Sequence, residues 1–339
     1  MEKGSCRVCV TGGSGYIASL LVKKLLNEGY TVHATVRKLD DHPKIDILKS
    51  FHGADTRLKL FVADIYKPEE FDEAIQGCEF VFHVATPLLH STGFKHNNRV
   101  DATVDSARIL ASLCIRSGTV RRLIYTASVV AASPLKEDGS GYKELMDETC
   151  WTPLDFSNPY SDIILQEYTQ SKTLAEKEIL RSGDGKIEVV SLVCGLVGGE
   201  TQMPSPPGSL LAILSLLTND EPAYNSLKFL EELLARVPIL HIEDACNAHI
   251  FCMKQDSING RFLCSNGYVS TAEIAGYYRS KYPELSINKD RFDCLKRDTK
   301  WVSTLLCERG FEYKFDWKMV LDDSVRYAKE TQMLVGLSS

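Results

Sequence analysis

Val10-Thr11-Gly12-Gly13-Ser14-Gly15-Tyr16-Ile17 is the stretch that decides the fold of this 339-residue chain. A short apolar run, residues 7–10, precedes the glycines, and apolar residues recur at helical spacing over residues 16–27 after them. A strand, a tight turn and a helix in this order direct the amides of a helix N-terminus towards a phosphate. Gly12 allows the turn, and Gly15 lets the backbone approach a pyrophosphate. The stretch therefore predicts the dinucleotide-binding turn of a Rossmann-type fold.

The alternation of strands and helices continues through the first two thirds of the chain. Strands are expected over residues 31–36, 58–62, 80–84, 122–126 and 187–193, and long helices over residues 100–116 and 159–180. This alternation is typical of a parallel sheet covered by helices. We therefore predict an α/β fold with a doubly wound parallel sheet, which forms a Rossmann domain over residues 1–198.

The chain changes character after Gly198. Residues 203–208 contain three prolines, which lack the amide donor and fix φ, so this segment cannot be regular structure. Helical spacing returns over residues 210–217, 226–234 and 271–281. We predict a smaller, mostly helical substrate-binding lobe over residues 199–339, some of whose segments return to the Rossmann core. It would lie over the carboxyl edge of the sheet, where open α/β sheets bind ligands.

Composition and charge exclude several classes of protein. A net charge of −6 argues against a nucleic-acid partner, which needs a basic face. No apolar run approaches the ~18 residues of a membrane span, and the first residues lack the apolar stretch of a secretory signal. Eleven cysteines in such a chain indicate reduced thiols and a cytoplasmic location. Cys6 and Cys9 fall on opposite faces of a strand, so we expect no disulfide between them, and no metal site is expected in the chain.

The end of the second strand indicates which dinucleotide is bound. NAD enzymes usually carry a carboxylate about 20 residues beyond the glycines, where it binds the ribose 2′-hydroxyl. Arg37 and Lys38 occupy that place here, with Lys44 a little further on. A guanidinium pairs with a 2′-phosphate, whereas a carboxylate would repel it. A solvated basic pair would give the same pattern, and a methyltransferase would place an acidic residue there. We predict NADPH/NADP+ as the cofactor.

Other cofactor contacts are expected at the turn and after the next two strands. Asp64 and Ile65 would bracket the adenine, with Asp64 accepting a hydrogen bond from its amino group. The ribose and pyrophosphate would pass along Val84, Ala85 and Thr86. The predicted contacts in the turn itself are Gly12, Ser14, Gly15, Tyr16 and Ile17.

A tyrosine and a lysine four residues apart provide the candidate for proton transfer. Tyr168 and Lys172 lie on one face of the helix that follows the fifth strand, and Ser128 directly follows that strand as predicted. A phenol can supply a proton if a nearby cation lowers its pKa, and the serine hydroxyl can orient an acceptor oxygen. The same spacing occurs in two further pairs, Tyr224 with Lys228 and Tyr277 with Lys281. These fall in the second lobe, where such pairs usually pack or face solvent, and Ser128 alone would more often bond to backbone.

The motifs together resemble those of the extended short-chain dehydrogenases/reductases of plants. The similarity rests on the glycine turn, Phe82-His83-Val84-Ala85-Thr86-Pro87, Tyr125-Thr126-Ala127-Ser128 and the run Ser171-Lys172-Thr173-Leu174-Ala175-Glu176-Lys177. That subgroup contains dihydroflavonol, anthocyanidin, vestitone and cinnamoyl-CoA reductases. The resemblance implies that Tyr168 is the proton donor and that Lys172 binds the nicotinamide ribose and modulates the tyrosine. It also implies cofactor contacts at residues 194–197, Cys194 and Val197 among them, and at Ser209. Position 194 is commonly proline in the relatives.

Departures from the subgroup's patterns bear on the substrate. Dihydroflavonol reductases typically carry asparagine where this chain has Ser133, and cinnamoyl-CoA reductases carry a different string around the tyrosine than residues 165–169 here. The length of residues 219–241 is closer to that of anthocyanidin reductases. The chain is therefore most similar to an anthocyanidin reductase. We expect the substrate at Pro87, Ser128, Ser133 and Tyr168.

The resulting hypothesis is an NADPH-dependent reductase of a plant specialised metabolite, a flavonoid in the first instance. The alternatives are a dihydroflavonol, isoflavanone or non-flavonoid (alkaloid) ketone reductase, an epimerase or hydroxysteroid-type dehydrogenase, and a non-catalytic dinucleotide sensor. Arg37 counts against the epimerase, and an intact Ser128, Tyr168 and Lys172 counts against the sensor. We expect a small-molecule substrate, no nucleic-acid or membrane partner, and a monomer or weak homodimer.

Overall fold

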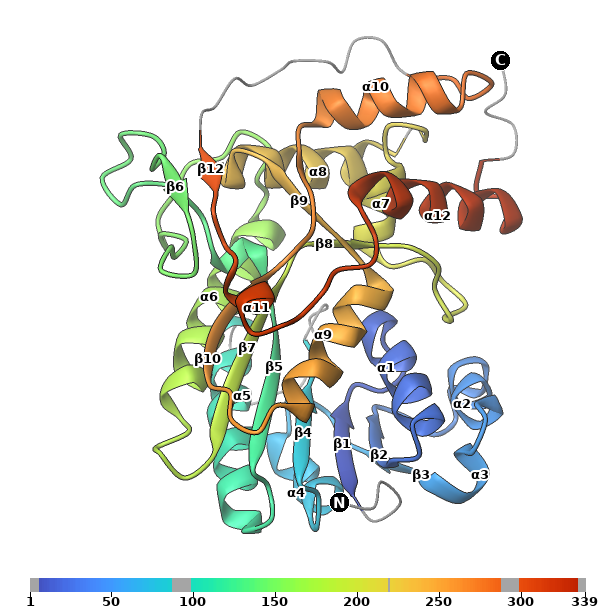
Figure 1. The fold of residues 1–339 in the computed structure, drawn as a ribbon, viewed down its shortest axis with the longest axis vertical. Helices are drawn as coiled ribbons and strands as arrows, with labels where there is room; N and C mark the ends of the chain where they lie inside the picture. The colour runs from blue at the N-terminus through green and yellow to red at the C-terminus, as the bar shows by residue number, and fades with distance from the viewer. Residues whose placement is uncertain (1–5, 87–98, 219, 288–298, 335–339) are drawn as a thin grey trace.

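The computed structural model describes residues 6–86, 99–218, 220–287 and 299–334, and it is organised around a seven-stranded parallel sheet (Figure 1). The strand order is β10-β7-β5-β4-β1-β2-β3. The strands are β1 (Arg7–Thr11), β2 (Thr31–Val36), β3 (Leu58–Val62), β4 (Phe80–His83), β5 (Arg122–Ser128), β7 (Glu188–Cys194) and β10 (Gly260–Cys264). The order reverses between β1 and β4, and a crevice forms at such a point outside the carboxyl ends of the strands. The predicted Rossmann-type doubly wound sheet is confirmed.

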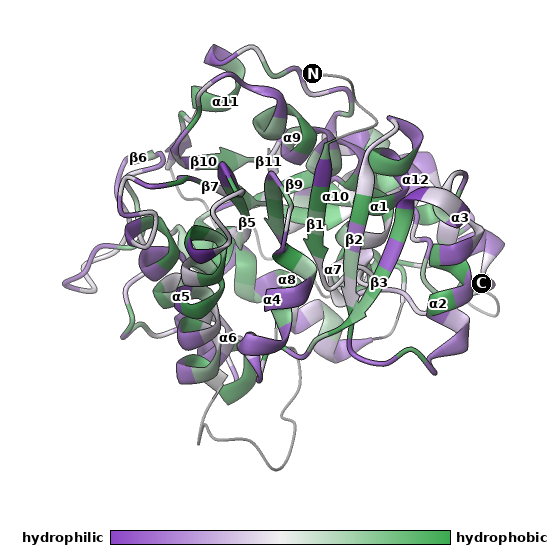
Figure 2. Cartoon of the chain, turned by 90° about the horizontal axis from the view of Figure 1, so that it is seen from below, coloured by the Kyte–Doolittle hydropathy of each residue, from purple (hydrophilic) through white to green (hydrophobic). Residues whose placement is uncertain are grey.

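Helices cover both faces of the sheet (Figure 1). One face carries α1 (Tyr16–Asn27), α2 (His42–Ser50), α3 (Ala54–Arg57) and α9 (Ile242–Lys254), and the other carries α4 (Asp72–Ile75), α5 (Arg99–Ser117) and α6 (Ile163–Arg181). Alternate residues of β1 enter separate cores: Cys6, Val8 and Val10 pack with α1, whereas Cys9 packs with α4 and α5. Cys6 and Cys9 therefore point to opposite faces, as the period-two geometry of a strand requires. Figure 2 shows apolar residues concentrated on the central strands.

The second lobe lies beyond the carboxyl ends of the strands (Figure 1). The second lobe contains a small sheet of order β11-β9-β8. Its strands are β8 (Leu196–Gly198), β9 (Val237–His241) and β11 (Tyr268–Val269). Its helices are α7 (Gly208–Leu214), α8 (Glu221–Leu234), α10 (Thr271–Lys281) and α12 (Trp317–Glu330), whereas the short helix α11 (Leu305–Glu308) packs against β10 of the large sheet. Two short strands, β6 (Leu145–Met146) and β12 (Lys300–Trp301), pair beside the second lobe.

Residues 242–264 leave the second lobe and return to the large sheet. Helix α9 packs on α1, and β10 pairs in parallel with β7 as the seventh strand. No local pattern in the sequence predicts this short strand, because its partner lies some 70 residues earlier in the chain: Gly260 pairs with Val190. The arrangement means that the site can receive side chains from a strand that lies in the chain between two segments of the second lobe.

Capping residues decide where two predicted helices begin. Helix α6 starts at Ile163, later than expected, because the Asp162 side chain accepts a hydrogen bond from the Leu165 amide at 2.8 Å. Helix α8 starts five residues earlier than expected, because Asp220 caps the Ala223 amide and Pro222 lies in the first turn, where no amide partner is needed.

The ten cysteines that the structure describes are all free, and all except Cys307 are buried. Within the same described ranges, no helix is both long enough and apolar enough to cross a lipid bilayer.

Candidate active site

The glycine-rich turn between β1 and α1 is held against two neighbouring strands. The Gly12 amide donates to the Thr35 hydroxyl at 3.0 Å, and the Gly13 amide donates to the Thr35 carbonyl at 2.8 Å. Gly12 has a φ of +67°, and a Cβ added there would lie 3.1 Å from the Ala85 Cα. A Cβ on Gly13 would lie 2.9 Å from the Ala34 Cβ. Both positions therefore require glycine for conformation or space.

The start of α1 suits an anionic ligand. Gly15, which precedes the helix, provides no capping side chain, so the first amides of α1 have no competing side-chain acceptor at that position. A Cβ on Gly15 would lie 3.1 Å from the Gly12 carbonyl, so the turn is closed tightly on itself. A narrow glycine cradle at a helix N-terminus fits a pyrophosphate.

The end of β2 presents the basic residues that the sequence singled out. Arg37 is exposed directly after β2. The Lys44 ammonium lies 2.8 Å from the Asp41 carboxylate, and this hydrogen bond holds the pKa of Asp41 below its usual value, with a smaller contribution from Arg37. After β3, the Asp64 carboxylate accepts from the Tyr66 amide at 3.0 Å, and Ile65 is buried.

A threonine and a histidine that the sequence analysis did not single out connect β1 to β4. The Thr11 hydroxyl accepts from the Val84 and Ala85 amides, each at 3.0 Å, and lies 3.0 Å from His83 Nδ1. Burial lowers the pKa of His83 to about 3, with a further lowering by Lys172, so the ring is neutral. Thr11 therefore donates its proton to Nδ1 while it accepts from both amides. Polar residues at the carboxyl ends of two buried strands were the available signal for this contact.

The three predicted catalytic side chains come together at the carboxyl end of β5. Ser128 is the last residue of β5, and its hydroxyl lies close enough to the Tyr168 phenol to influence the pKa of that phenol. Burial raises the pKa of Tyr168, and the neighbouring Ser128 hydroxyl opposes that rise. Ser128 also accepts from the Val130 amide at 3.4 Å, so the backbone-bonding role occurs as well.

Lys172, the third predicted catalytic residue, is buried. Its ammonium donates to the Thr126 carbonyl at 2.8 Å, lies 3.4 Å from the Thr86 hydroxyl and stands 4.8 Å from the centre of the Tyr125 ring. Burial lowers the pKa of Lys172 to about 8, and Glu176, one turn further along α6, opposes that lowering. Thr86 connects the lysine to the segment expected to line the cofactor path.

The two competing tyrosine–lysine pairs lie in the second lobe, on α8 and α10. Lys228 on α8 forms an ion pair with Glu231 at 2.6 Å, and both side chains are 1% exposed. Tyr277 on α10 donates to Asp322 at 2.8 Å. Their partners belong to the packing of α8, α10 and α12.

Comparisons with known proteins agree with this geometry. Residues 8–263 match the NAD dependent epimerase/dehydratase family. The chain belongs to this family. It is 33% identical over 98% of its length to an anthocyanidin reductase ((2S)-flavan-3-ol-forming) of Vitis vinifera, covering 97% of that protein. It is 32% identical over 98% of its length to a dihydroflavonol 4-reductase of Gerbera hybrida, covering 88% of that protein.

A solved structure gives the same assignment. Vestitone reductase from alfalfa (Medicago sativa L.) superposes with a TM-score of 0.77 at 31% identity, over 96% of this chain and 99% of that one. The predicted resemblance to extended short-chain dehydrogenases/reductases of the anthocyanidin and dihydroflavonol reductase group is confirmed, and the chain is an oxidoreductase of this type. Its cofactor is a nicotinamide dinucleotide, which the glycine cradle fits.

The other family positions predicted to contact cofactor or substrate are distributed around the crevice. Cys194 ends β7 opposite Ser128 in the sheet register and is buried. Val197 is buried in β8, and Ser209 is in the first turn of α7. Ser133 is fully buried: its hydroxyl donates to the Leu233 carbonyl at 2.6 Å and accepts from the Leu135 amide at 3.0 Å. Pro87 lies outside the described residues.

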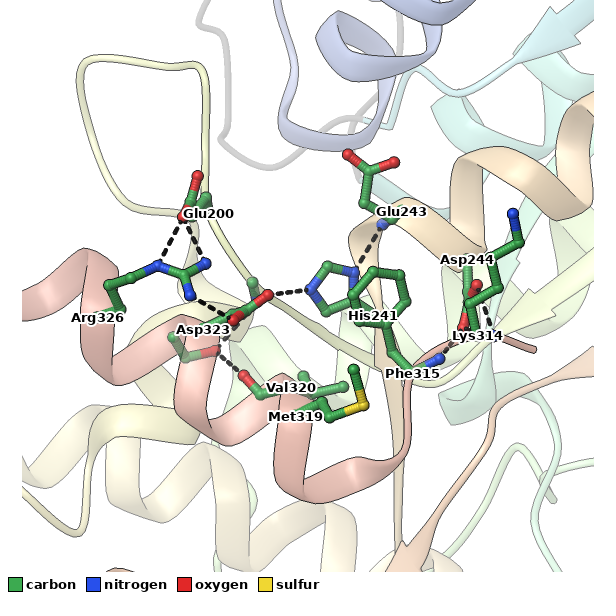
Figure 3. Close-up of polar contacts among 12 residues, drawn as sticks. Glu200, His241, Glu243, Asp244, Lys314, Phe315, Met319, Val320, Asp323 and Arg326 are labelled. Carbon is green, nitrogen blue, oxygen red and sulfur yellow. Dashed lines mark hydrogen bonds and ion pairs between the residues drawn. The ribbon is translucent and has the colours of Figure 1, made fainter. Parts of the chain in front are cut away.

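A polar network fastens the second lobe of this family member to the cofactor turn. The Tyr16 hydroxyl donates to the Gly199 carbonyl at 2.9 Å. Arg326 on α12 pairs with Glu200 at 2.7 Å and with Asp323 at 2.9 Å (Figure 3). Tyr16, predicted as a cofactor contact, is therefore also joined to the segment that leads into the second lobe.

His241 occupies the centre of this network (Figure 3). Its ring stacks on Phe315 with centroids 3.8 Å apart, its Nε2 lies 3.1 Å from Asp323, and its Nδ1 accepts from the Glu243 amide at 3.1 Å. Burial lowers the pKa of His241, while Asp323 opposes the shift. These contacts occupy both ring nitrogens and give His241 a packing and capping role.

Proposed function

We propose that the chain is an NADPH-dependent reductase of a plant flavonoid, similar to anthocyanidin reductase in its substrate. The observation that carries the proposal is the convergence of Ser128, Tyr168 and the buried Lys172 at the carboxyl end of β5, where the Lys172 ammonium is held by the Thr126 carbonyl. A hydrogen-bond donor, a proton source and a cation within one site are what the reduction of a carbonyl or conjugated oxygen acceptor needs.

The bound nicotinamide ring would supply the hydride to the acceptor carbon. Ser128 would donate a hydrogen bond to the acceptor oxygen, and Tyr168 would transfer its phenolic proton to that oxygen as negative charge develops there. The cationic Lys172 would stabilise the tyrosinate, which then regains a proton from solvent. Lys172 would also hold the ribose, since its ammonium already lies near Thr86 at the end of β4.

Arg37 supports NADPH over NADH. Its guanidinium is exposed directly after β2, with Lys44 and Asp41 paired close by. This is the place where the family's dinucleotide turn brings the adenosine ribose. A guanidinium there favours a 2′-phosphate.

A dihydroflavonol or isoflavanone reductase and a reductase of non-flavonoid ketones would use the same catalytic groups. The hydroxyl donor of Ser133 is already used by the Leu233 carbonyl, so a substrate ring hydroxyl cannot receive that proton without breaking the bond. This favours a substrate that needs no hydrogen bond donated by Ser133, including a non-flavonoid ketone.

The proposal also retains a small-molecule substrate, a monomer or weak homodimer and a cytoplasmic location. The free cysteines of the described residues support that location.

The test is a measurement of NADPH oxidation with a panel of anthocyanidins, dihydroflavonols, flavanones and isoflavanones, with Tyr168→Phe as the control. We expect turnover with an anthocyanidin and loss of turnover in Tyr168→Phe, while the variant still binds NADPH. Turnover confined to other ketones would move the substrate outside the anthocyanidins. Tight NADPH binding without turnover of any carbonyl would favour the non-catalytic sensor.

A further inference from the structure

A buried carboxylate lies one helical turn beyond Lys172. Glu176 on α6 is fully buried and accepts a hydrogen bond from the Ser191 hydroxyl at 2.6 Å. Its charge is met by Arg261 on β10, whose Nε lies 2.9 Å from Oε1 and whose second terminal nitrogen lies 3.2 Å from Oε2. This is a two-point guanidinium–carboxylate pair with the arginine side chain 7% exposed.

The remaining donors of Arg261 bind backbone near the other catalytic segment. One terminal nitrogen donates to the Glu148 carbonyl at 2.8 Å and the Cys150 carbonyl at 2.5 Å. The other donates to the Ala131 carbonyl at 3.1 Å. All five N–H groups of the guanidinium therefore have an acceptor. Its plane lies over the Trp151 ring, 3.7 Å from the ring centre.

The Ala131 contact is important because of its place in the chain. Ala131 ends the short 3-10 turn Val129–Ala131, which follows Ser128 directly. One guanidinium thus holds both the helix that carries Tyr168 and Lys172 and the turn that continues from Ser128. Loss of its geometry would move the serine relative to the tyrosine.

The groups around Lys172 show how the pair acts on its charge. Glu176 lies on its own helix, Cys194 on β7, neutral His83 on β4 and the Tyr125 ring on β5. Among these, Glu176 raises the pKa of Lys172 most strongly against the effect of burial. Because Arg261 is paired with the Glu176 carboxylate, its positive charge offsets part of the attraction between Glu176 and Lys172.

We propose that Arg261 is a positioning residue for catalysis: it aligns the Ser128 and Tyr168 segments, and its charge limits how strongly Glu176 holds Lys172 in the charged form. This inference rests on the proposed function, since it concerns the same site. Arg261 comes from β10, which lies in the chain between two segments of the second lobe, so a strand that enters the large sheet from that lobe supports the catalytic groups of the first.

The experiment measures the titration of Lys172 directly. Lysine labelled with carbon-13 at Cε is followed by NMR against pH in the full chain, with Lys172→Met to assign the signal. This measurement needs no turnover, so it stays informative if the proposed reductase activity fails. A pH profile of kcat is recorded in parallel where a substrate has been found.

Glu176→Gln removes the carboxylate and leaves Arg261 in place. We expect the Lys172 midpoint to fall by about one pH unit, because an opposite charge is lost and a like charge remains. The double variant Glu176→Gln/Arg261→Gln removes both charges, and its midpoint should lie between those of the single variant and the wild type. Coincident midpoints in the single and double variants would overturn the electrostatic part of the proposal.

Arg261→Lys keeps the positive charge and loses the planar guanidinium, whose N–H groups bind Glu176 and the Ala131 carbonyl together. We expect a Lys172 midpoint close to the wild-type value and a lower kcat with little change in KM, since the Ala131 contact is lost. An unchanged kcat in Arg261→Lys would overturn the alignment part.

A matched control separates these effects from a general loss of stability. Arg122 at the start of β5 is 1% exposed, pairs with Glu188 and donates to four backbone carbonyls, but it lies at the end of the strand opposite Ser128. Arg122→Lys and Glu188→Gln should lower the unfolding temperature without moving the Lys172 midpoint. Equal shifts of the midpoint in the control and test variants would reduce Arg261 to a structural role.

Discussion

Replacement of Thr11 by valine tests whether the β1–β4 junction holds the cofactor crevice. Valine has nearly the same shape and suits a buried strand, so the change removes one hydroxyl and little packing. Three groups lose their partner: the Val84 amide, the Ala85 amide and His83 Nδ1, each 3.0 Å from the Thr11 oxygen.

The magnitude follows from the burial of these groups. A buried polar group left without a partner costs about 1–3 kcal/mol. His83 is 2% exposed, so it belongs in the middle of that range, whereas the segment of Val84 and Ala85 is only half-buried and belongs at the lower end. We expect Thr11→Val, which leaves all three groups without a partner, to lower the free energy of unfolding by about 4 kcal/mol. Because Val84 and Ala85 border the predicted cofactor path, NADPH affinity should fall as well.

The assay combines urea unfolding with NADPH titration followed by fluorescence. Thr11→Ser is the matched control, since it keeps the hydroxyl and loses a methyl group, and it should recover most of the lost affinity. A Thr11→Val protein as stable as the wild type, with unchanged NADPH affinity, would refute the reasoning.

Three further predictions concern separate parts of the molecule. Tyr168→Phe should lower kcat at least about 100-fold, because the proton source is lost, while the dissociation constant for NADPH measured by fluorescence stays within about twofold; normal turnover would contradict the mechanism. Arg37→Asp should lower kcat/KM for NADPH by about tenfold or more and lower that for NADH less, because the carboxylate repels a 2′-phosphate; an unchanged ratio of the two values would place the phosphate elsewhere. Glu231→Gln should destabilise the chain by about 3–5 kcal/mol in urea unfolding, because Lys228 keeps a buried charge without its counter-ion. Lys228→Met combined with Glu231→Gln should regain most of that loss, because it removes the buried cation while the glutamine oxygen still accepts from the Thr271 amide; a failure to do so would mean that the pair has a role beyond mutual compensation.

Local patterns account for the parts of the site that could be predicted. The positive φ of Gly12 and the i, i+4 spacing of Tyr168 and Lys172 are consequences of a few consecutive residues, so their geometry follows from the backbone alone. The parallel strands follow from apolar runs separated by helical segments, and the crevice follows from the strand order. The pairing of Ser128 with Tyr168 needed only the further assumption that the helix after β5 packs beside it.

Contacts between distant residues could not be predicted in this way. Thr11 meets His83, 72 positions away, because β1 and β4 are neighbours in the sheet. Arg261 meets Glu176, 85 positions away, because β10 and helix α6 both pack beside β7. Ser133 was expected to face a substrate, and its burial against Leu233 depends on how α8 packs over the turn after β5.

The sequence by itself determined the dinucleotide turn, the parallel sheet and the order of the catalytic groups, because short-range conformation and periodicity carry that information. Tertiary structure alone decided which buried charges compensate one another and which strand completes the site. Those contacts form only when segments far apart in the chain are brought out of water together, and a single sequence contains no local signal for that event.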